Sequence, residues 1–183
     1  MTIKQMFLSF QYAGRTGFVL LCLCYGGFMH AAIAQSATPA TYPKITAYAG
    51  AVHPVVTFSN HKPAYNFDGV YVGGLVTGIN LWKSSNIGFS MEFVPFIRAA
   101  GGTSRMSNFL FHPGALFALG KGYTLATRAA FETSGRYGFT PVINKVVRKN
   151  KGSSYYIAIP VPVRFGNDLP STLTLSFQFG IAF

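Results

Sequence analysis

The sequence predicts an all-β protein: an eight-stranded antiparallel transmembrane β-barrel that follows a cleaved signal peptide. The first observation is the segment TLTLSFQFGIAF (172–183), where Leu, Phe and Ile alternate without a break with small or mildly polar residues. This alternation fits a strand with lipid on one side and a narrow interior on the other. The second is that 50% of the residues are hydrophobic, although no uninterrupted apolar run in the body reaches the ~20 residues of a spanning helix.

Residues 1–34 are predicted to be a secretory signal peptide. Lys4 and Arg15 supply a basic flank, the run 18–24 (FVLLCLC) is apolar, and Ala-Ile-Ala at 32–34 is a small-x-small cleavage site. The alternative is a retained anchor helix, but the apolar run is short and glycines soon interrupt it. The mature chain is therefore expected to be exported.

Cysteine use and charge narrow the possible ligands. Cys22 and Cys24 are the 2 cysteines, and both lie in the predicted signal peptide. The mature chain then forms neither a disulfide nor a thiolate metal site, and no cofactor is expected. The sequence has 15 Lys and Arg against 4 Asp and Glu, and without Lys4 and Arg15 the balance is 13 − 4 = +9. Because an exported chain rarely meets nucleic acid, anionic lipid headgroups are the better partner.

A short periplasmic tail at 35–42 is expected to precede a barrel at 43–183. The tight turns are expected at 83–86 and 120–122, and loops at 59–66, 99–107 and 166–171. About twelve residues at ~3.3 Å each, tilted by about 40°, rise about 30 Å and cross an apolar band of ~25 Å. The strands are expected at 44–58, 67–82, 87–98, 108–119, 123–133, 137–147, 154–165 and 172–183.

The sixth strand is the least obvious. Without a strand between 134 and 153 the count is seven, whereas bacterial single-chain barrels close with an even number. YGFTPVINKVV (137–147) is rich enough in β-branched residues to serve. The basic residues that follow, at 148–151, would then form a periplasmic turn. The alternative is one long outer loop over 134–153, with its basic cluster facing anionic lipopolysaccharide.

Aromatic residues at strand ends suggest membrane interfaces. Trp82, Tyr123 and Tyr155 adjoin predicted turns, where interfacial girdles lie. Each could instead be an ordinary core aromatic.

The signal peptide, the eight-strand pattern and the aromatic terminal strand together resemble the small outer-membrane β-barrel proteins of Gram-negative bacteria, the OmpA/OmpX-like group. The signal peptide that ends in Ala-Gln and the residue pattern of 154–165 resemble those of its Bacteroidetes branch. The resemblance implies insertion into the outer membrane by the barrel assembly machinery, with Phe177, Phe179, Ile181 and Phe183 as the assembly signal. It implies no single activity, because this fold hosts structural proteins, adhesins, channels and lipid-modifying enzymes.

Strand parity predicts what fills the lumen. The charged residues of the third, fifth and seventh strands all fall on the polar face, as a membrane barrel requires. Their heights pair Glu92 with Arg128 and Glu132 with Arg164. An eight-stranded barrel has room inside for side chains only, so a charged plug is expected; a conducting path or a catalytic cluster are the alternatives. The predicted lumen network comprises Glu92, Arg98, Arg128, Glu132 and Arg164.

Two prolines mark a candidate lateral seam. Pro160 and Pro162 lie two residues apart in one predicted strand, so both missing N–H groups face the same neighbour. The alternatives are a local bulge and an opening through which an acyl chain enters from the bilayer.

The expected function is a non-enzymatic outer-membrane barrel with a structural or surface-interaction role. It would contact outer-membrane lipids and lipopolysaccharide, and its oligomeric state is left open. The alternatives are a lipid-modifying enzyme with lateral lipid access near Pro160 and Pro162, and a narrow, porin-like passive channel. No nucleophile motif supports catalysis, and the histidines lack acidic or cysteine neighbours at metal-ligand spacing, so neither catalytic nor metal residues are expected.

Overall fold

The computed structural model describes residues 41–183. The predicted signal peptide and all but the last two residues of the predicted tail lie outside this range. No helix in the described part is long and apolar enough to cross a membrane. The strands are β1 (Lys44–Ser59), β2 (Lys62–Tyr65), β3 (Val70–Trp82), β4 (Ile87–Ala100), β5 (Thr103–Gly120), β6 (Tyr123–Glu132), β7 (Tyr137–Lys149), β8 (Ser154–Pro160), β9 (Val163–Phe165) and β10 (Thr172–Ala182).

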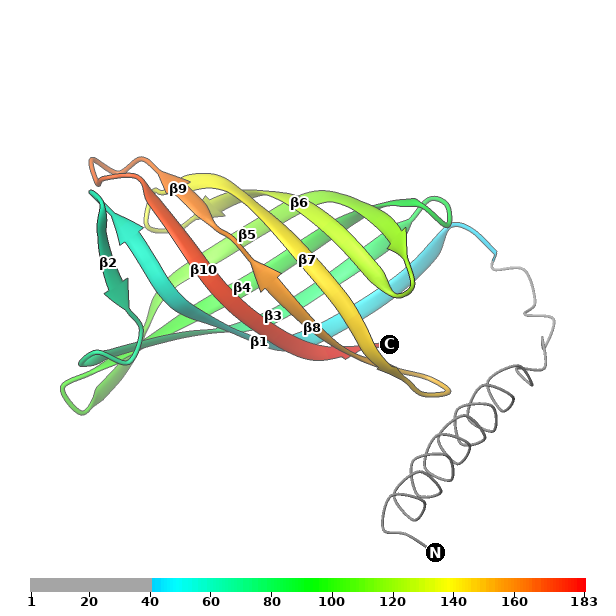
Figure 1. Cartoon of the computed structure of the whole chain (residues 1–183), viewed down its shortest axis with the longest axis horizontal. Helices are drawn as coiled ribbons and strands as arrows, with labels where there is room; N and C mark the ends of the chain where they lie inside the picture. The colour runs from blue at the N-terminus through cyan, green and yellow to red at the C-terminus, as the bar shows by residue number, and fades with distance from the viewer. Residues whose placement is uncertain (1–40) are drawn as a thin grey trace, which may run out of the picture. The chain divides into compact units, whose positions relative to one another are not determined.

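The strands form a closed antiparallel ring (Figure 1). Neighbours follow the order β1, β3, β4, β5, β6, β7, β8 and β10, and β10 pairs back onto β1. β9 continues β8 at the same ring position, since it also pairs with β7 and β10, while β2 pairs only with β1. The ring therefore has eight positions. The predicted barrel is confirmed, including the strand expected at 137–147.

The two ends of the barrel differ in their connections. One end holds the start of β1, the end of β10 and the short turns at 83–86, 121–122 and 150–153. Short turns and both termini are periplasmic in such barrels, so we call this the periplasmic end and the opposite one the outer end. The basic residues after β7 therefore lie at the periplasmic end.

Two outer-end segments are more ordered than expected. The predicted loop 59–66 contains β2, which folds back on β1 as a hairpin. Most of the predicted loop 99–107 is strand, because β4 and β5 continue outward until they meet at Gly101-Gly102, where both φ angles are positive (57° and 76°). A glycine pair supplies that backbone without strain. The Gly-rich loop predicted for 99–107 is therefore limited to the turn at Gly101-Gly102.

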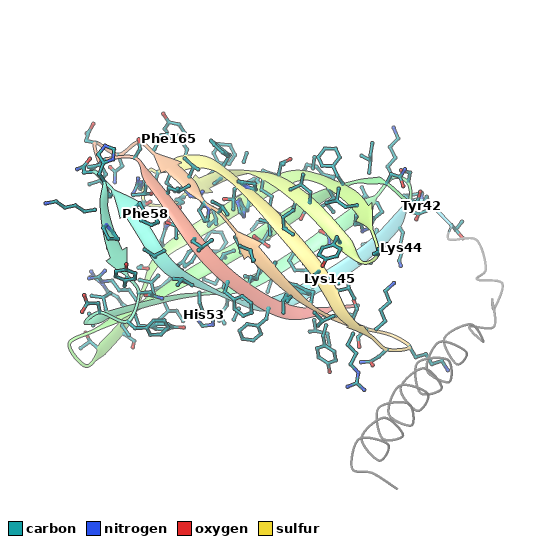
Figure 2. The ribbon with its side chains drawn as sticks, in the orientation of Figure 1. Tyr42, Lys44, His53, Phe58, Lys145 and Phe165 are labelled. Atoms are coloured by element: carbon teal, nitrogen blue, oxygen red, sulfur yellow. The ribbon has the colours of Figure 1, made fainter. Side chains whose placement is uncertain are left out.

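The strands alternate between an apolar exterior and a packed interior. Large apolar side chains cover the outside (Figure 2); Phe93, Ile143 and Phe177, for example, are 39%, 43% and 42% exposed. Val76 and Val94 are each 1% exposed and point inward. A soluble sheet would bury its large apolar face, whereas this one presents it outward, as a lipid-facing wall does.

The interfacial aromatics are only partly as expected. Tyr123 and Tyr155 are exposed, 44% and 46%, near the periplasmic end. Trp82 instead packs against the buried cluster of the lumen. It lies on the inward parity of β3, two residues beyond Asn80, and therefore cannot face lipid.

Candidate functional site

A hydrogen-bonded cluster spans the middle of the lumen. Tyr48 comes from β1, Ser90 and Glu92 from β4, His112 from β5 and Arg128 from β6. All five are at most 7% exposed. We call these five residues the central network.

The carboxylate of Glu92 is the hub of the central network. Its Oε1 lies 2.9 Å from His112 Nδ1, and its Oε2 accepts from the Tyr48 hydroxyl at 3.0 Å and lies 3.4 Å from Arg128 Nη1. Arg128 also donates to Ser90 Oγ at 3.2 Å and to the Tyr48 hydroxyl at 3.2 Å. A buried charge is tolerated when it is both paired and hydrogen-bonded, and Glu92 has three partners.

The imidazole of His112 is fixed by this contact. A carboxylate only accepts, so Nδ1 carries the proton that it donates to Glu92, and in a neutral ring Nε2 is left as an acceptor. His112 is 3% exposed, yet its Nε2 has no hydrogen-bond partner among the described residues.

A second ion pair lies nearer the outer end. Arg164 Nε donates to Glu132 Oε1 at 2.7 Å, and Arg164 Nη1 donates to Thr140 Oγ1 at 3.0 Å. The other carboxylate oxygen of Glu132 accepts from Asn108 at 2.6 Å and from Ser134 at 3.0 Å. We call Glu132 and Arg164 the outer ion pair.

The outer ion pair should couple energetically. Glu132→Ala is expected to lower the free energy of unfolding by about 1.5–3 kcal/mol, because it removes a charged hydrogen bond from a largely buried guanidinium. Adding Arg164→Ala should recover part of that loss, since no unpaired charge then remains. Urea titration of the single and double variants in detergent measures the coupling. Strictly additive losses would contradict it.

The structure brings together four of the five residues predicted to form the lumen network, in two ion pairs, and leaves Arg98 outside. Arg98 is exposed and pairs in register with Arg105 of β5. Arg98 lies on the inward-facing side of β4 by parity, but β4 extends beyond the packed interior of the barrel. The side chain therefore lies in solvent. Height along the strand, not parity, explains the difference.

Sequence reasoning did not identify how two tyrosines pack inside the lumen. Tyr48 lies opposite Gly78 in the ladder, and Tyr156 lies opposite Gly180. A Cβ on either glycine would collide with the facing tyrosine ring, so the absent side chain makes the space that the ring fills. This directs the Tyr48 hydroxyl toward Glu92. A glycine on the inward face of a strand is the signal that could have revealed these positions.

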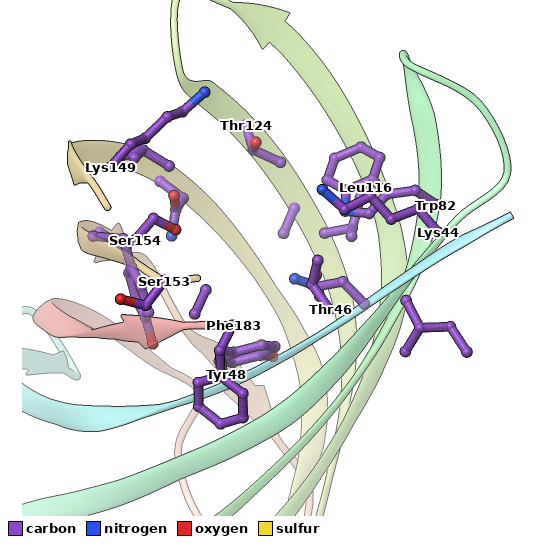
Figure 3. A pocket seen from close by; sticks show the side chains of 18 of the residues that line it. Lys44, Thr46, Tyr48, Trp82, Leu116, Thr124, Lys149, Ser153, Ser154 and Phe183 are labelled. Carbon is purple, nitrogen blue, oxygen red and sulfur yellow. The ribbon is translucent and has the colours of Figure 1, made fainter. Parts of the chain in front are cut away.

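Two cavities lie in the lumen. The lower cavity, about 570 Å³, opens toward the periplasmic end, and Arg128 lines it. Tyr48, Lys44 and Lys149 also line it (Figure 3). The upper cavity, about 310 Å³, has Glu92 and His112 in its lining and extends to the outer ion pair. The central network thus contributes residues to both cavities.

The wall of the upper cavity contains an interrupted ladder. β10 pairs with β8 as far as Gln178↔Ala158, and with β9 from Leu173↔Val163 onward. The four residue pairs between them, 159–162 facing 174–177, do not form a regular ladder. On the other side, Val161 N–H donates to Pro141 of β7 at 3.0 Å. We call this interruption the β8–β10 gap.

Proline explains the β8–β10 gap. Thr174 N–H donates to the Pro162 carbonyl at 2.8 Å, so residues 162 and 174 occupy a position where two residues normally exchange two hydrogen bonds, and residues 160 and 176 fall on the same phase of the ladder. Pro160 and Pro162 have no N–H to return. Across the gap, Ser176 also lies opposite Pro54 of β1.

The residues of the predicted assembly signal follow the outward parity of β10 and of the residue after it, and Ile181 among them is half-buried. Phe177, Phe179 and Phe183 are 42%, 46% and 61% exposed. Phe183 exchanges two backbone hydrogen bonds of 2.9 Å with Ala47 of β1, so it also takes part in ring closure.

Comparisons with known proteins find similar folds and no similar sequences. No protein-family model and no curated protein matches the chain. A de novo designed transmembrane β-barrel is similar to it, with 11% identity over 78% of this chain and 97% of that chain and a TM-score of 0.46. The outer-membrane protein OprG from Pseudomonas aeruginosa is similar with 8% identity over 75% of this chain and 93% of that chain, at a TM-score of 0.38. The closed ring, the apolar exterior and the buried charged interior of the chain itself are those of a small transmembrane β-barrel.

Proposed function

We propose that the protein is a non-enzymatic outer-membrane barrel with a structural or surface-interaction role, whose lumen is plugged by the central network. The observation that carries the proposal is the continuous set of contacts from Tyr48 on β1 through Glu92 to Arg128 on β6. These side chains occupy the space that an ion would need, and an eight-stranded barrel leaves little other room.

The plug predicts a barrel that does not conduct. In planar-bilayer recording, the wild-type protein is expected to give no steady single-channel current. The double variant Glu92→Gly/Arg128→Gly removes both charges together and shortens both side chains, so it should admit small currents. Wild-type currents as large as those of the double variant would contradict the plug and favour the passive channel.

Lipid modification is the second candidate, and one observation favours it. A carboxylate that orients an imidazole is how a general base is held, and Glu92 and His112 are so arranged beside the upper cavity. A hydrolase or transferase would also need a nucleophile, and His112 Nε2 meets no hydroxyl among the described residues. A lipid A profile of a deletion strain tests this candidate: an unchanged profile supports the non-enzymatic role.

The proposed partners follow from the apolar exterior of the barrel and from its outer end. The apolar exterior lies in the lipid bilayer. We propose that lipopolysaccharide contacts the outer end, and that the barrel assembly machinery recognises the aromatic residues of β10 during insertion.

A further inference from the structure

The upper cavity has the composition of a site for a lipid-like ligand. Its apolar lining includes Val52, Val94, Phe96, Leu110 and Val142, and its volume of about 310 Å³ falls at the small end of ligand pockets, which span roughly 300–1,000 Å³. Most such sites combine an apolar wall with a few convergent polar groups.

Two residues that line this cavity have a buried nitrogen without a partner among the described residues, His112 Nε2 and Arg136 Nε. Arg136 lies nearer the outer end, where its Nη2 already donates to two backbone carbonyls, whereas His112 belongs to the central network. His112 is buried and lines the cavity, and its Nε2 is unpartnered among the described residues. Leaving a buried acceptor unsatisfied costs about 1–3 kcal/mol. A ligand O–H group at this position would satisfy Nε2, while Glu92 keeps Nδ1 protonated.

The β8–β10 gap adjoins the same cavity. Pro160, Pro162, Thr174 and Ser176 all line it, so the weakened stretch of wall separates the cavity from the membrane. On the outer side of that stretch, Ile159, Leu175 and Phe177 are 51%, 44% and 42% exposed and face lipid. Opening the gap would therefore join two apolar spaces.

Ring order places His112 across the lumen from the gap. β5 is the fourth position of the ring, and the gap lies between the seventh and eighth. His112 lies eight residues from the periplasmic end of β5, and Pro162 lies eight residues beyond the first residue of β8, which is at the same end. A polar group that passes inward through the gap therefore points toward Nε2.

We propose that the upper cavity binds a single-chain amphiphile with a small O–H-bearing polar end, such as a protonated fatty acid, which enters from the bilayer through the β8–β10 gap. The polar end hydrogen-bonds to His112 Nε2, and the hydrocarbon chain lies along the apolar lining and the gap. Binding involves no covalent step and does not require the barrel to conduct ions.

Photolabelling in lipid nanodiscs tests the site, with a photoreactive palmitic acid as the probe. Leu110 and Leu116 are a matched pair on β5, 3% and 2% exposed, and they line the upper and lower cavities, respectively. Leu110→Trp should reduce labelling of lumen-facing peptides at least tenfold, whereas Leu116→Trp should leave it within twofold. Heat-modifiable migration confirms that each variant is folded. Equal labelling of both variants, or labelling confined to the lipid-facing exterior, would overturn the site.

Affinity and rate separate the polar contact from the route of access. His112→Phe should weaken binding about tenfold, the value of one buried hydrogen bond. Pro160→Ala/Pro162→Ala restores two ladder donors, so it should slow association at least tenfold; Pro113→Ala, elsewhere in the wall, is the control. Unchanged association in the double variant would overturn access through the gap, and unchanged affinity in His112→Phe would overturn the contact.

Discussion

Replacing Glu92 with alanine is expected to lower the free energy of unfolding of the refolded barrel by about 3–5 kcal/mol. The substitution leaves Arg128 buried with no carboxylate among the described residues within ion-pair distance, since Glu92 is its one ion-pair partner there. It also removes the acceptor used by Tyr48 and His112. The loss should exceed that of Glu132→Ala, because Arg164 keeps Thr140 and two backbone carbonyls as acceptors, whereas Arg128 keeps the hydroxyls of Ser90 and Tyr48.

Urea titration in detergent, followed by heat-modifiable migration, measures this loss. Glu92→Leu/Arg128→Leu is the control, since replacing both charges with apolar side chains should cost much less than removing one. A single variant as stable as the double variant would show that the buried guanidinium needs no counter-charge, and it would remove the electrostatic account of the plug.

Replacing Phe93 with arginine is expected to cost about 2–4 kcal/mol, because Phe93 lies near the middle of β4 on the lipid side, where a charge is most expensive. Phe93 also stacks with Phe111 at a centroid distance of 5.4 Å, and that contact is lost as well. Refolding into phospholipid vesicles across a denaturant series measures the effect.

Ile87→Arg is the matched control for Phe93→Arg. Ile87 lies on the same face of β4, at its periplasmic end, and is 52% exposed. A cation there reaches the interface, so the expected cost is about 0–1 kcal/mol. Equal costs at the two positions would mean that depth in the membrane does not govern the penalty, and the lipid-facing assignment of β4 would be wrong.

Parity explains why so much of the wall could be predicted from sequence. A two-residue period sorts side chains to two faces without knowledge of any neighbour, and it placed Glu92, Arg128, Glu132 and Arg164 in the lumen. The heights of these residues paired them correctly, because charges at similar distances from the strand starts meet inside a narrow barrel.

Parity could not predict contacts that depend on the register of the neighbouring strand. The contact of Tyr48 with Glu92 follows from Gly78 opposite the ring, a cross-strand relation that requires the register. Arg98 has the right parity but lies beyond the lumen, because the outward extension of β4 and β5 is visible only once both strands are paired. The contact of His112 with Glu92 likewise depends on β4 and β5 being in register, since the two residues face each other across these strands.

The closed ring also bears on aggregation. A free strand edge offers unpaired N–H and C=O groups to other chains, and pairing of β1 with β10 removes both edges that an open sheet of this size would have. Among the described strands, β2 is the one that pairs with a neighbouring strand along only one of its edges. It is four residues long and carries Lys62 and Pro63, a cation and a residue without an N–H. Shortness, charge and proline are the features that keep an edge from templating a neighbour, so crowded copies of this barrel should meet through side chains and lipid rather than through shared sheets.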